Sequence, residues 1–339
     1  MTTPPLTPAI TVLGAGSWGT ALALLLARNG QEVRLWSYDS AHILEMRRER
    51  CNTRYLPGIL FSDNLQLFTD LSSALTAVRD ILIVVPSHAF PELLLKIKPF
   101  LLPESRIAWG TKGLEPNKGQ LLHLLVEDIL GKSHSKAVLA GPSFAQEVAM
   151  NKPTAITLAT EDAEFAQSLG DQLMNSNFRV YTTADMVGVE ICGAVKNILA
   201  IAAGIVDGLD LGMNALSALI TRGLAEMQRL GMAAGGKPAT FMGLAGVGDL
   251  ILTCTGNLSR NRRFGAAIGQ GKTTRQALQE IGQVVEGLNN LDGVYHLAEK
   301  LGIEMPIIEQ IHQVIYHDVP VGLAIENLLS REPRSEAEW

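Results

Sequence analysis

The 339-residue sequence contains few cysteines, no excess of basic charge and no long uninterrupted apolar run. Its three cysteines, Cys51, Cys192 and Cys254, are odd in number and far apart, so we expect neither a disulfide framework nor a paired-cysteine zinc site. The formal net charge of −6 argues against a nucleic-acid backbone or an anionic membrane surface as the main partner. Apolar runs such as Ala21–Ala27 are too short to span a bilayer, so no stable membrane insertion is expected.

Targeting and metal-binding patterns are also missing. No basic residue precedes Arg28, which argues against a signal peptide, and the cysteine usage favours a reducing compartment, so we expect a cytoplasmic protein. The seven histidines form no H-x-x-x-H pair and no cluster with carboxylates, so a metal site is not expected. His88 follows a predicted strand and is an acid/base candidate, although its position favours the start of a helix.

The first half of the chain alternates short apolar segments with helical ones. An apolar fraction of 47% and a charged fraction of 18% indicate a folded chain, and its length predicts about two domains. The predicted strands are Ile10–Leu13, Val33–Trp36, Leu65–Phe68, Ile81–Val85, Arg106–Trp109, Ala137–Ala140, Ala155–Ala159 and Arg179–Thr182, with helices at Trp18–Arg28 and Gly119–Leu130. This pattern predicts an α/β domain, a doubly wound Rossmann-type sheet that binds a nucleotide.

The pattern changes near residue 185. The remaining segments have helical length and period: Met186–Val206, Ala215–Leu230, Thr274–Ile281, Asn290–Leu301, Ile307–Ile315 and Val321–Leu329. We therefore expect a dinucleotide-binding domain over residues 1–184 and an all-α substrate and catalytic domain over residues 185–339. No linker rich in proline or serine separates them, so we expect the two domains to pack closely around a cleft.

A glycine-rich motif is the most specific single signal. Gly14, Gly16 and Gly19 form G-x-G-x-x-G directly after a predicted strand and at the start of a predicted helix. In this motif the first glycine permits a tight turn, the second lets a pyrophosphate approach the backbone, and the third lets the helix pack on the strand. The helix N-terminus also attracts phosphate. A glycine-rich turn that binds nothing is the alternative.

Asp39 bears on the choice of dinucleotide. It lies 25 residues after Gly14, near where an acidic residue would hold the adenosine ribose of NAD. A carboxylate there repels the 2′-phosphate of NADP, but Arg47, Arg48 and Arg54 are near enough in sequence to offset the repulsion. The sequence leaves the preference between NAD and NADP open.

Lys196 is the one basic residue of the apolar segment Met186–Val206. Glu190 is six residues away and therefore about 120° around the helix, which makes it a poor partner. Burial would lower the pKa of the lysine toward the range that suits proton transfer to a ketone or from an alcohol. Alternatively, the side chain extends along an amphipathic helix to the surface.

Polar groups that suit a phosphorylated substrate interrupt the apolar pattern in three places. Lys112, in GTKG, follows a predicted strand at the end where parallel sheets bind ligands. Gly141 and Ser143, in AGPSF, leave donors open to a ligand, and Pro142 suits a first helical turn. The third stretch contains Asp249 and then Ser259, Arg260 and Asn261, a good grip for an oxyanion, although the spacing alone favours an exposed basic loop.

Taken together, these motifs resemble the bacterial NAD(P)-dependent glycerol-3-phosphate dehydrogenases. The resemblance runs from about Ile10 to Ile315 and includes GAGSWGTALA, VVPSH, TKGLE, GPSFAQEV, FRVY, GAVKNILAIAAG, ALITRGLAEM, GVGDLILTCT, SRNRRFG, GQVVEG and EMPI. It implies reversible reduction of dihydroxyacetone phosphate to sn-glycerol 3-phosphate with NAD(P)H, which supplies glycerophospholipid synthesis, and it suggests a homodimer.

The resemblance also assigns residues. It makes Lys196 the proton donor and acceptor and implies substrate contacts for Lys112, Gly141, Ser143, Asp249, Ser259, Arg260 and Asn261. It implies dinucleotide contacts for Ser17, Trp18, Tyr38, Tyr55, Lys112, Ala145, Arg260, Val284 and Glu286, beside the three glycines and Asp39. Family members often have His at the position of Tyr38 and Arg at that of Asp39, so the adenosine contacts of this chain depart from the pattern.

Two other functions share parts of this pattern. A β-hydroxyacid dehydrogenase has a similar pair of domains and a Lys-Asn pair on a helix, but its substrate presents a carboxylate, whereas the cluster at Arg260 favours a phosphate. A protein that only senses NAD(H) would have no use for a proton donor such as Lys196.

Overall fold

The computed structural model describes residues 9–115, 119–332 and 335, and the chain divides into two compact units. The first comprises residues 1–111 and 123–186, and the second comprises residues 112–122 and 187–339. Lys112 therefore belongs to the second unit, although it follows a strand of the first.

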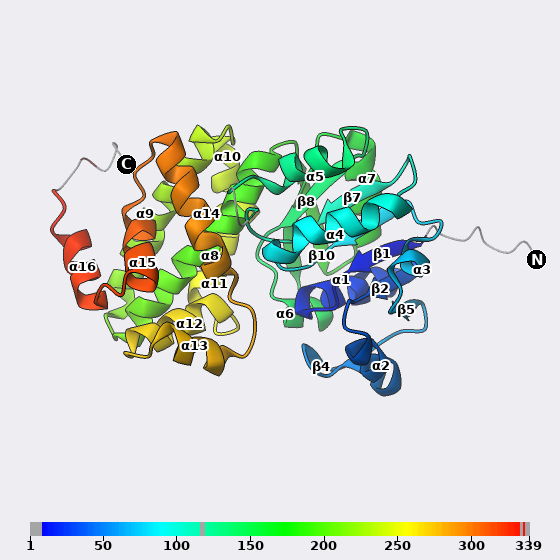
Figure 1. The fold of residues 1–339 in the computed structure, drawn as a ribbon, viewed down its shortest axis with the longest axis horizontal. Helices are drawn as coiled ribbons and strands as arrows, with labels where there is room; N and C mark the ends of the chain where they lie inside the picture. The colour runs from blue at the N-terminus through cyan, green and yellow to red at the C-terminus, as the bar shows by residue number, and fades with distance from the viewer. Residues whose placement is uncertain (1–8, 116–118, 333–334, 336–339) are drawn as a thin grey trace, which may run out of the picture. The chain divides into compact units, whose positions relative to one another are not determined.

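The first unit contains an eight-stranded sheet in the order β10-β9-β8-β7-β6-β1-β2-β5 (Figure 1). Its strands are β1 (Ile10–Leu13), β2 (Val33–Trp36), β5 (Leu65–Phe68), β6 (Asp80–Ile83), β7 (Arg106–Trp109), β8 (Lys136–Ala140), β9 (Thr154–Ala159) and β10 (Phe178–Thr183). All eight predicted strands are present, with ends that differ by two residues at most. The Rossmann-type fold class is confirmed.

The sheet departs from simple parallel winding at one place. β8 pairs with β9 in antiparallel fashion, while the other neighbours in the sheet are parallel. The helix between them, α6 (Ala145–Ala149), has only five residues, about 7.5 Å, which is too short to carry the chain back along a strand. A small hairpin of β3 (Cys51–Asn52) and β4 (Leu56–Leu60) was not predicted.

Helices cover both faces of this sheet. They are α1 (Ser17–Arg28), α2 (Ser40–Glu49), α3 (Leu71–Leu75), α4 (Phe90–Ile97), α5 (Leu122–Leu130), α6 and α7 (Ala163–Leu173), with short 3-10 turns at Ser87–Ala89 and Lys98–Phe100. α1, α6 and α7 share one core with alternate sheet residues. The sheet residues between these face the other side of the sheet, where Thr11 donates to the carbonyl oxygen of Ala74 on α3 and Trp109 contacts Phe90, the first residue of α4. The predicted helix Gly119–Leu130 begins only at Leu122, because Gly119 has φ of 62°.

The described part of the second unit is helical and contains no strand. Its elements are α8 (Met186–Gly208), α9 (Gly212–Ala233), α10 (Pro238–Phe241), a π-helical turn (Leu244–Gly248), α11 (Asp249–Thr255), α12 (Arg260–Gly269), α13 (Thr274–Ile281), α14 (Glu286–Leu301), α15 (Pro306–Tyr316) and α16 (Val321–Leu329). The predicted all-α character is confirmed, whereas α10, α11 and α12 were not predicted.

Glycines bring α8 and α12 into backbone contact. A Cβ at Gly204 would lie 1.9 Å from the carbonyl oxygen of Arg262, and a Cβ at Gly265 would lie 2.0 Å from that of Ile201. Neither position tolerates a side chain without separating the helices. The start of α12 is therefore held tightly against the middle of α8, the helix that carries Lys196.

The uninterrupted apolar runs are too short to span a membrane, but two longer helical stretches that include polar residues have the length and composition to do so. These stretches are Met186–Gly208 and Pro238–Thr255, which have mean hydropathies of 1.8 and 1.2. Met186–Gly208 is 94% buried within the protein, as a core helix is, whereas Pro238–Thr255 is 39% buried.

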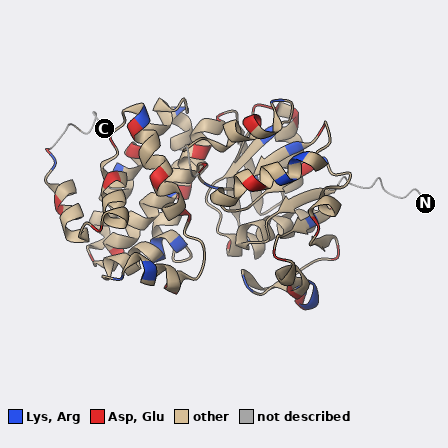
Figure 2. Ribbon diagram, in the orientation of Figure 1, with Lys and Arg blue, Asp and Glu red and all other residues tan. Residues whose placement is uncertain are grey.

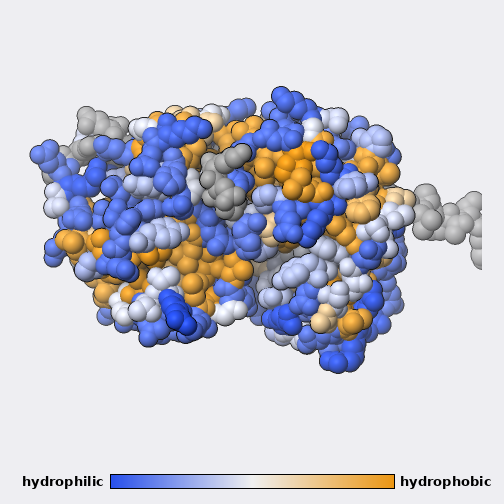
Figure 3. Space-filling view, viewed as in Figure 1, coloured by the Kyte–Doolittle hydropathy of each residue, from blue (hydrophilic) through white to orange (hydrophobic). Residues whose placement is uncertain are grey.

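The visible surface mixes apolar and hydrophilic residues (Figure 3), and basic residues stand out on α12 and α13 (Figure 2).

Candidate active site

The Lys196 side chain is 3% exposed, so it does not extend to the surface. It lies near the middle of α8, among Ala, Val and Ile side chains that give it no polar partner. Its partners come instead from α11: the ammonium lies 2.6 Å from Asp249 Oδ1 and donates to Thr253 Oγ1 at 2.9 Å. A buried cation with two such partners is held at a fixed point.

Asp249 connects Lys196 to a second lysine. Its other oxygen, Oδ2, accepts a hydrogen bond of 3.0 Å from Lys112 Nζ. Asp249 is 1% exposed, whereas the Lys112 side chain is 21% exposed. One buried carboxylate thus joins two ammonium groups, of which one is fully enclosed and the other still reaches solvent.

The charges in this cluster oppose one another. The pKa of Lys196 is lowered from 10.5 to about 7: burial lowers it most, the charge of Lys112 also lowers it, and Asp249 acts to raise it. Burial acts to raise the pKa of Asp249, but the two lysines outweigh it and hold that pKa below its ordinary value. Asp249 is therefore ionised, and Lys196 can both give and accept a proton near neutral pH.

Two residues of the cluster were missed in the sequence. Thr253 accepts from Lys196 and donates to the Asp249 carbonyl oxygen at 2.6 Å. It stands four residues after Asp249 on α11, a spacing that would have placed the two on one helix face. Asn197 follows Lys196, and its side-chain oxygen accepts from Asn261 Nδ2 at 2.9 Å.

The segment Ser259–Asn261 begins a helix, so the expectation of an exposed basic loop was wrong. Ser259 is the N-cap of α12 and accepts from the backbone N–H of Arg262 at 3.2 Å. The polar sequence hid this helix, which is recognisable from its capping serine. Asn261 is 8% exposed and accepts from the N–H of Gly287, while Arg260 Nη1 donates to Gln283 Oε1 at 3.3 Å.

Val284 and Glu286 lie in the segment that contacts the start of α12 through Gln283 and Gly287. Glu286 is the first residue of α14, and Val284, two residues before it, is 37% exposed. Cys254 is 1% exposed, and burial raises the pKa of its thiol to about 12, so it is a buried, neutral residue as predicted.

The three motif glycines of the first unit lie in the environments that dinucleotide binding needs. Gly14 has φ of 119°, and a Cβ there would be 2.4 Å from the Val84 carbonyl oxygen. A Cβ at Gly19 would be 1.9 Å from the Gly14 carbonyl oxygen. A Cβ at Gly16, in contrast, would meet no atom within 4 Å, and no side chain caps α1, which begins at Ser17. Open space thus lies before a helix N-terminus, as a pyrophosphate requires.

The adenosine-side candidates follow β2. Tyr38 is 85% exposed. Asp39 caps α2 by accepting from the N–H of His42 at 3.0 Å, and its other oxygen pairs with Arg54 at 3.0 Å. Of the three arginines considered, Arg54 alone pairs with Asp39, because Arg47 donates to the Leu67 carbonyl oxygen and Arg48 pairs with Glu49.

The contacts of Tyr55 and Trp18 are local. Tyr55 contacts the His42 ring edge to face, and Asn52 accepts from its N–H at 3.2 Å. Trp18 Nε1 is buried without a hydrogen-bond partner, near Gly110 at the end of β7.

The segment after β8 differs from its prediction. α6 begins at Ala145, so Pro142 lies in a loop and not in a first helical turn. Gly141 has φ of 141°, where a side chain would be strained, and its carbonyl oxygen accepts from Ser143 Oγ at 2.9 Å. The hydroxyl of Ser143 therefore already has a partner, and Ala145 packs on the sheet core.

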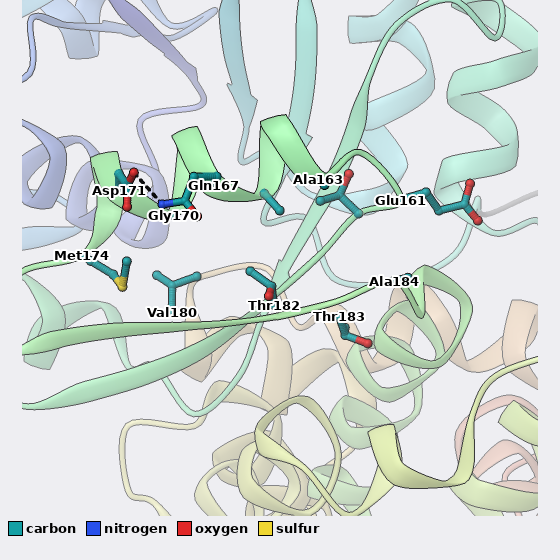
Figure 4. A pocket seen from close by; sticks show the side chains of 12 residues that line it. Glu161, Ala163, Gln167, Gly170, Asp171, Met174, Val180, Thr182, Thr183 and Ala184 are labelled. Atoms are coloured by element: carbon teal, nitrogen blue, oxygen red, sulfur yellow. Dashed lines mark hydrogen bonds between the residues drawn. The ribbon is translucent and has the colours of Figure 1, made fainter.

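A cavity of about 520 Å³ lies elsewhere in the first unit, between α7 and β10 (Figure 4). It is lined by Thr160, Glu161, Ala163, Ala166, Gln167, Gly170, Asp171, Met174, Val180, Thr182, Thr183 and Ala184. None of the predicted site residues is among them, so this cavity is separate from the lysine cluster.

Comparison with known proteins gives the family. Residues 9–166 match the NAD-dependent glycerol-3-phosphate dehydrogenase N-terminus, and residues 185–326 match its C-terminus. The chain belongs to this family. Its relatives include the glycerol-3-phosphate dehydrogenase [NAD(P)+] of Coxiella burnetii, 54% identical over 96% of this chain and 98% of the relative, and that of Vibrio cholerae, 52% identical over 96% and 95%.

Solved structures agree with this assignment. The crystal structure of glycerol-3-phosphate dehydrogenase from Coxiella burnetii has a TM-score of 0.94 and 54% identity, and the match covers 96% of this chain and all of that one. The enzyme from Saccharomyces cerevisiae gives a TM-score of 0.82 at 27% identity, covering 95% and 99% of the two chains. The resemblance seen in the motifs is confirmed, and with it a glycerol-3-phosphate dehydrogenase in place of a β-hydroxyacid dehydrogenase or a sensor.

Proposed function

We propose that the protein interconverts dihydroxyacetone phosphate and sn-glycerol 3-phosphate with NAD(P)H, and so supplies glycerophospholipid synthesis. The observation that carries this proposal is the buried group of Lys196, Asp249 and Lys112 in a chain of this family. The family name covers both NAD and NADP.

The first unit would hold the dinucleotide. The open space at Gly16 and the uncapped start of α1 fit a pyrophosphate, and the dinucleotide supplies the hydride. Ser17 and Trp18 would lie along the phosphates, and Tyr38, Asp39 and Tyr55 along the adenosine. Asp39 favours a free 2′-hydroxyl, while its partner Arg54 is the cation available to a 2′-phosphate. Ala145, Val284 and Glu286 complete the proposed contacts.

Lys196 would carry the proton. During reduction, the carbonyl oxygen of the substrate would gain negative charge as its carbon is reduced, and a protonated Lys196 would neutralise that charge by donating a proton. During oxidation, the neutral amine takes that proton back. Asp249 and Thr253 hold the amine in place throughout, and Lys112 remains the more exposed cation near the substrate oxygens.

The substrate phosphate would bind at the start of α12. Arg260 offers a guanidinium at a helix N-terminus, where both the charge and the backbone dipole favour an anion. Asn261 donates a hydrogen bond to Asn197, the residue next to Lys196, so the proposed phosphate site and the proton donor are connected directly. Gly141 and Ser143 are the contacts proposed from the first unit.

We further propose that the protein is a cytoplasmic homodimer and that its dinucleotide-binding domain ends near residue 185, apart from residues 112–122, which fold with the helical unit. Size-exclusion chromatography with light scattering would test the dimer: a mass of about twice the chain mass of 36.5 kDa is expected.

Absorbance of reduced nicotinamide tests the reaction. Dihydroxyacetone phosphate should be consumed with NADH or NADPH, and β-hydroxyacids should not be oxidised. Lys196→Ala should lose about 10²–10⁴ in turnover, whereas Lys300→Ala, an exposed lysine on α14, should retain it. Near-normal turnover in Lys196→Ala would exclude the proton role.

A further inference from the structure

Asn290 is a buried side chain that the reaction as described leaves without a role. It lies on α14 and is 1% exposed. Its Oδ1 accepts from the N–H of Leu114 at 3.0 Å, and its Nδ2 donates to the Lys112 carbonyl oxygen at 3.3 Å and to the Glu286 carbonyl oxygen at 2.8 Å. One amide thus binds the backbone on both sides of Gly113 and fastens it to α14.

The backbone between those two bonds lies directly on the amide. Gly113 has φ of 139°, and a Cβ there would lie 2.1 Å from Asn290 Oδ1. One turn further along α14, the carbonyl oxygen of Gly293 would lie 2.8 Å from a Cβ at Gly119. The loop therefore rests on α14 at two points, and at the first of them only glycine fits.

Lys112 is the functional residue that this arrangement fixes. Its carbonyl oxygen is bound by Asn290, and its ammonium is bound by Asp249. The charged groups that act on Lys196 are Asp249, from α11, and Lys112, from the loop. Cys254, also on α11, is neutral because burial raises the pKa of its thiol to about 12. Displacing Lys112 would thus change the charge that Lys196 experiences.

We propose that Asn290 is a positioning residue for catalysis, which holds the Lys112 backbone so that the Lys112 ammonium stays on Asp249 beside Lys196. This proposal rests on the proposed function. Asn290 acts through Lys112 and does not itself contact substrate.

The chemistry of the position explains why it is an amide. The site needs one acceptor, for the N–H of Leu114, and a donor for two carbonyl oxygens. A carboxylate would place negative charge against those carbonyls, and leucine of similar size would leave the N–H of Leu114 buried without a partner and remove the bond to the Lys112 carbonyl oxygen. Asparagine supplies both functions from one planar group.

Asn290→Ala tests the proposal, with Asn327→Ala as the matched control, because Asn327 is an exposed asparagine on α16. The readouts are the pH dependence of kcat/KM for glycerol 3-phosphate oxidation, NADH affinity by fluorescence, and the titration of Lys196 by NMR with labelled lysine side chains. If Asn290→Ala does not fold, Gly113→Ala disturbs the same contact from the loop side and carries the same expectation.

In Asn290→Ala, Lys112 is no longer held beside Asp249 and repels Lys196 less, so the pKa of Lys196 should rise. The acidic limb of the pH profile for oxidation, where Lys196 loses its proton, should therefore move to higher pH. kcat/KM should fall about 10- to 100-fold, and NADH affinity should fall less than kcat/KM, because Lys112 is only one of the proposed dinucleotide contacts. Lys112→Ala should move the limb in the same direction, and the double variant should move it little further. Asn327→Ala should match the wild type.

An unchanged limb in Asn290→Ala, or shifts that add fully in the double variant, would overturn the positioning role. Failure of the proposed function looks different. In that case the wild-type protein would not turn over dihydroxyacetone phosphate, while the NMR titration would still report whether Asn290 acts on Lys196 through Lys112.

Discussion

Asp249 holds two ammonium groups with one carboxylate, so Asp249→Asn is a direct test of how the lysine cluster works. The change keeps the size of the side chain and removes its charge. Lys196 then keeps the two influences that lower its pKa, burial and Lys112, and loses the one that raises it. The amide NH₂ of asparagine would also face one of the two lysines, and because both groups are hydrogen-bond donors that lysine would lose its acceptor.

The size of the effect follows from the contact. Asp249 Oδ1 is 2.6 Å from the Lys196 ammonium, and both groups are almost fully buried. A partner charge at this range moves a pKa by about 1–3 units, so on the alkaline side the protonated fraction of Lys196 should fall about 10- to 10³-fold. The alkaline limb of kcat/KM for dihydroxyacetone phosphate reduction should therefore move to lower pH, opposite to the shift expected of Asn290→Ala.

The assay is NADH oxidation from about pH 4 to 9, a range that includes the lowered pKa of Lys196, after circular dichroism has shown that the variant is folded. Asp171→Asn, an exposed aspartate on α7 that pairs with Gln167, is the control. A limb that stays in place, or moves to higher pH, would refute the reasoning, because it would mean that Asp249 does not hold the proton on Lys196.

Three further predictions concern other parts of the chain. Glu226 is buried on α9 and accepts from the N–H groups of Ile307 and Ile308; burial raises its pKa to about 7, so the folded state keeps a proton that the unfolded state loses above about pH 4.5. The free energy of unfolding should therefore fall by about 3 kcal/mol as pH rises from 4.5 to 7, and urea titrations of Glu226→Gln should lack this slope. Asp80→Ala should cost about 3–5 kcal/mol in the same measurement, because it leaves Arg106 buried without the carboxylate it contacts at 2.6 Å. Gly16→Val should keep its melting temperature and lose NADH affinity, whereas Gly19→Ala should lower the melting temperature; equal stability losses in both would contradict the roles given to these glycines.

The strands of the eight-stranded sheet were predictable because most are short apolar runs. β1, β6 and β7 are buried on both faces, whereas β5 and β10 expose alternate residues. The order of the strands was partly predictable, since alternation with helices implies parallel winding. The reversal of β9 was not predictable, because it depends on the length of α6, and the Pro142 pattern indicated only where a helix would begin. β6 begins at Asp80, which a search for apolar runs excludes because it is charged. Asp80 can lie inside the sheet because it pairs with Arg106.

The site was less predictable, because its residues are distant in sequence. Lys196 stood out as a cation in an apolar helix, but nothing local indicated that Asp249, 53 residues later, would meet it. Lys112 and Asp249 were connected only by resemblance to a family. Asn290 gave no signal at all, because a helical asparagine gains meaning only from the backbone that folds onto it.

Residues 112–122 leave the strand-rich part of the chain to fold with the helical unit, and the chain then returns at residue 123. A gene cut once at residue 185 would consequently separate Lys112 from Lys196, and the helical fragment would carry Asp249 with only one of its two cations. The two halves of this protein cannot be exchanged as independent cassettes: a chimera that takes its helical half from a relative must also import the eleven-residue excursion, or its proton donor will titrate at the wrong pH.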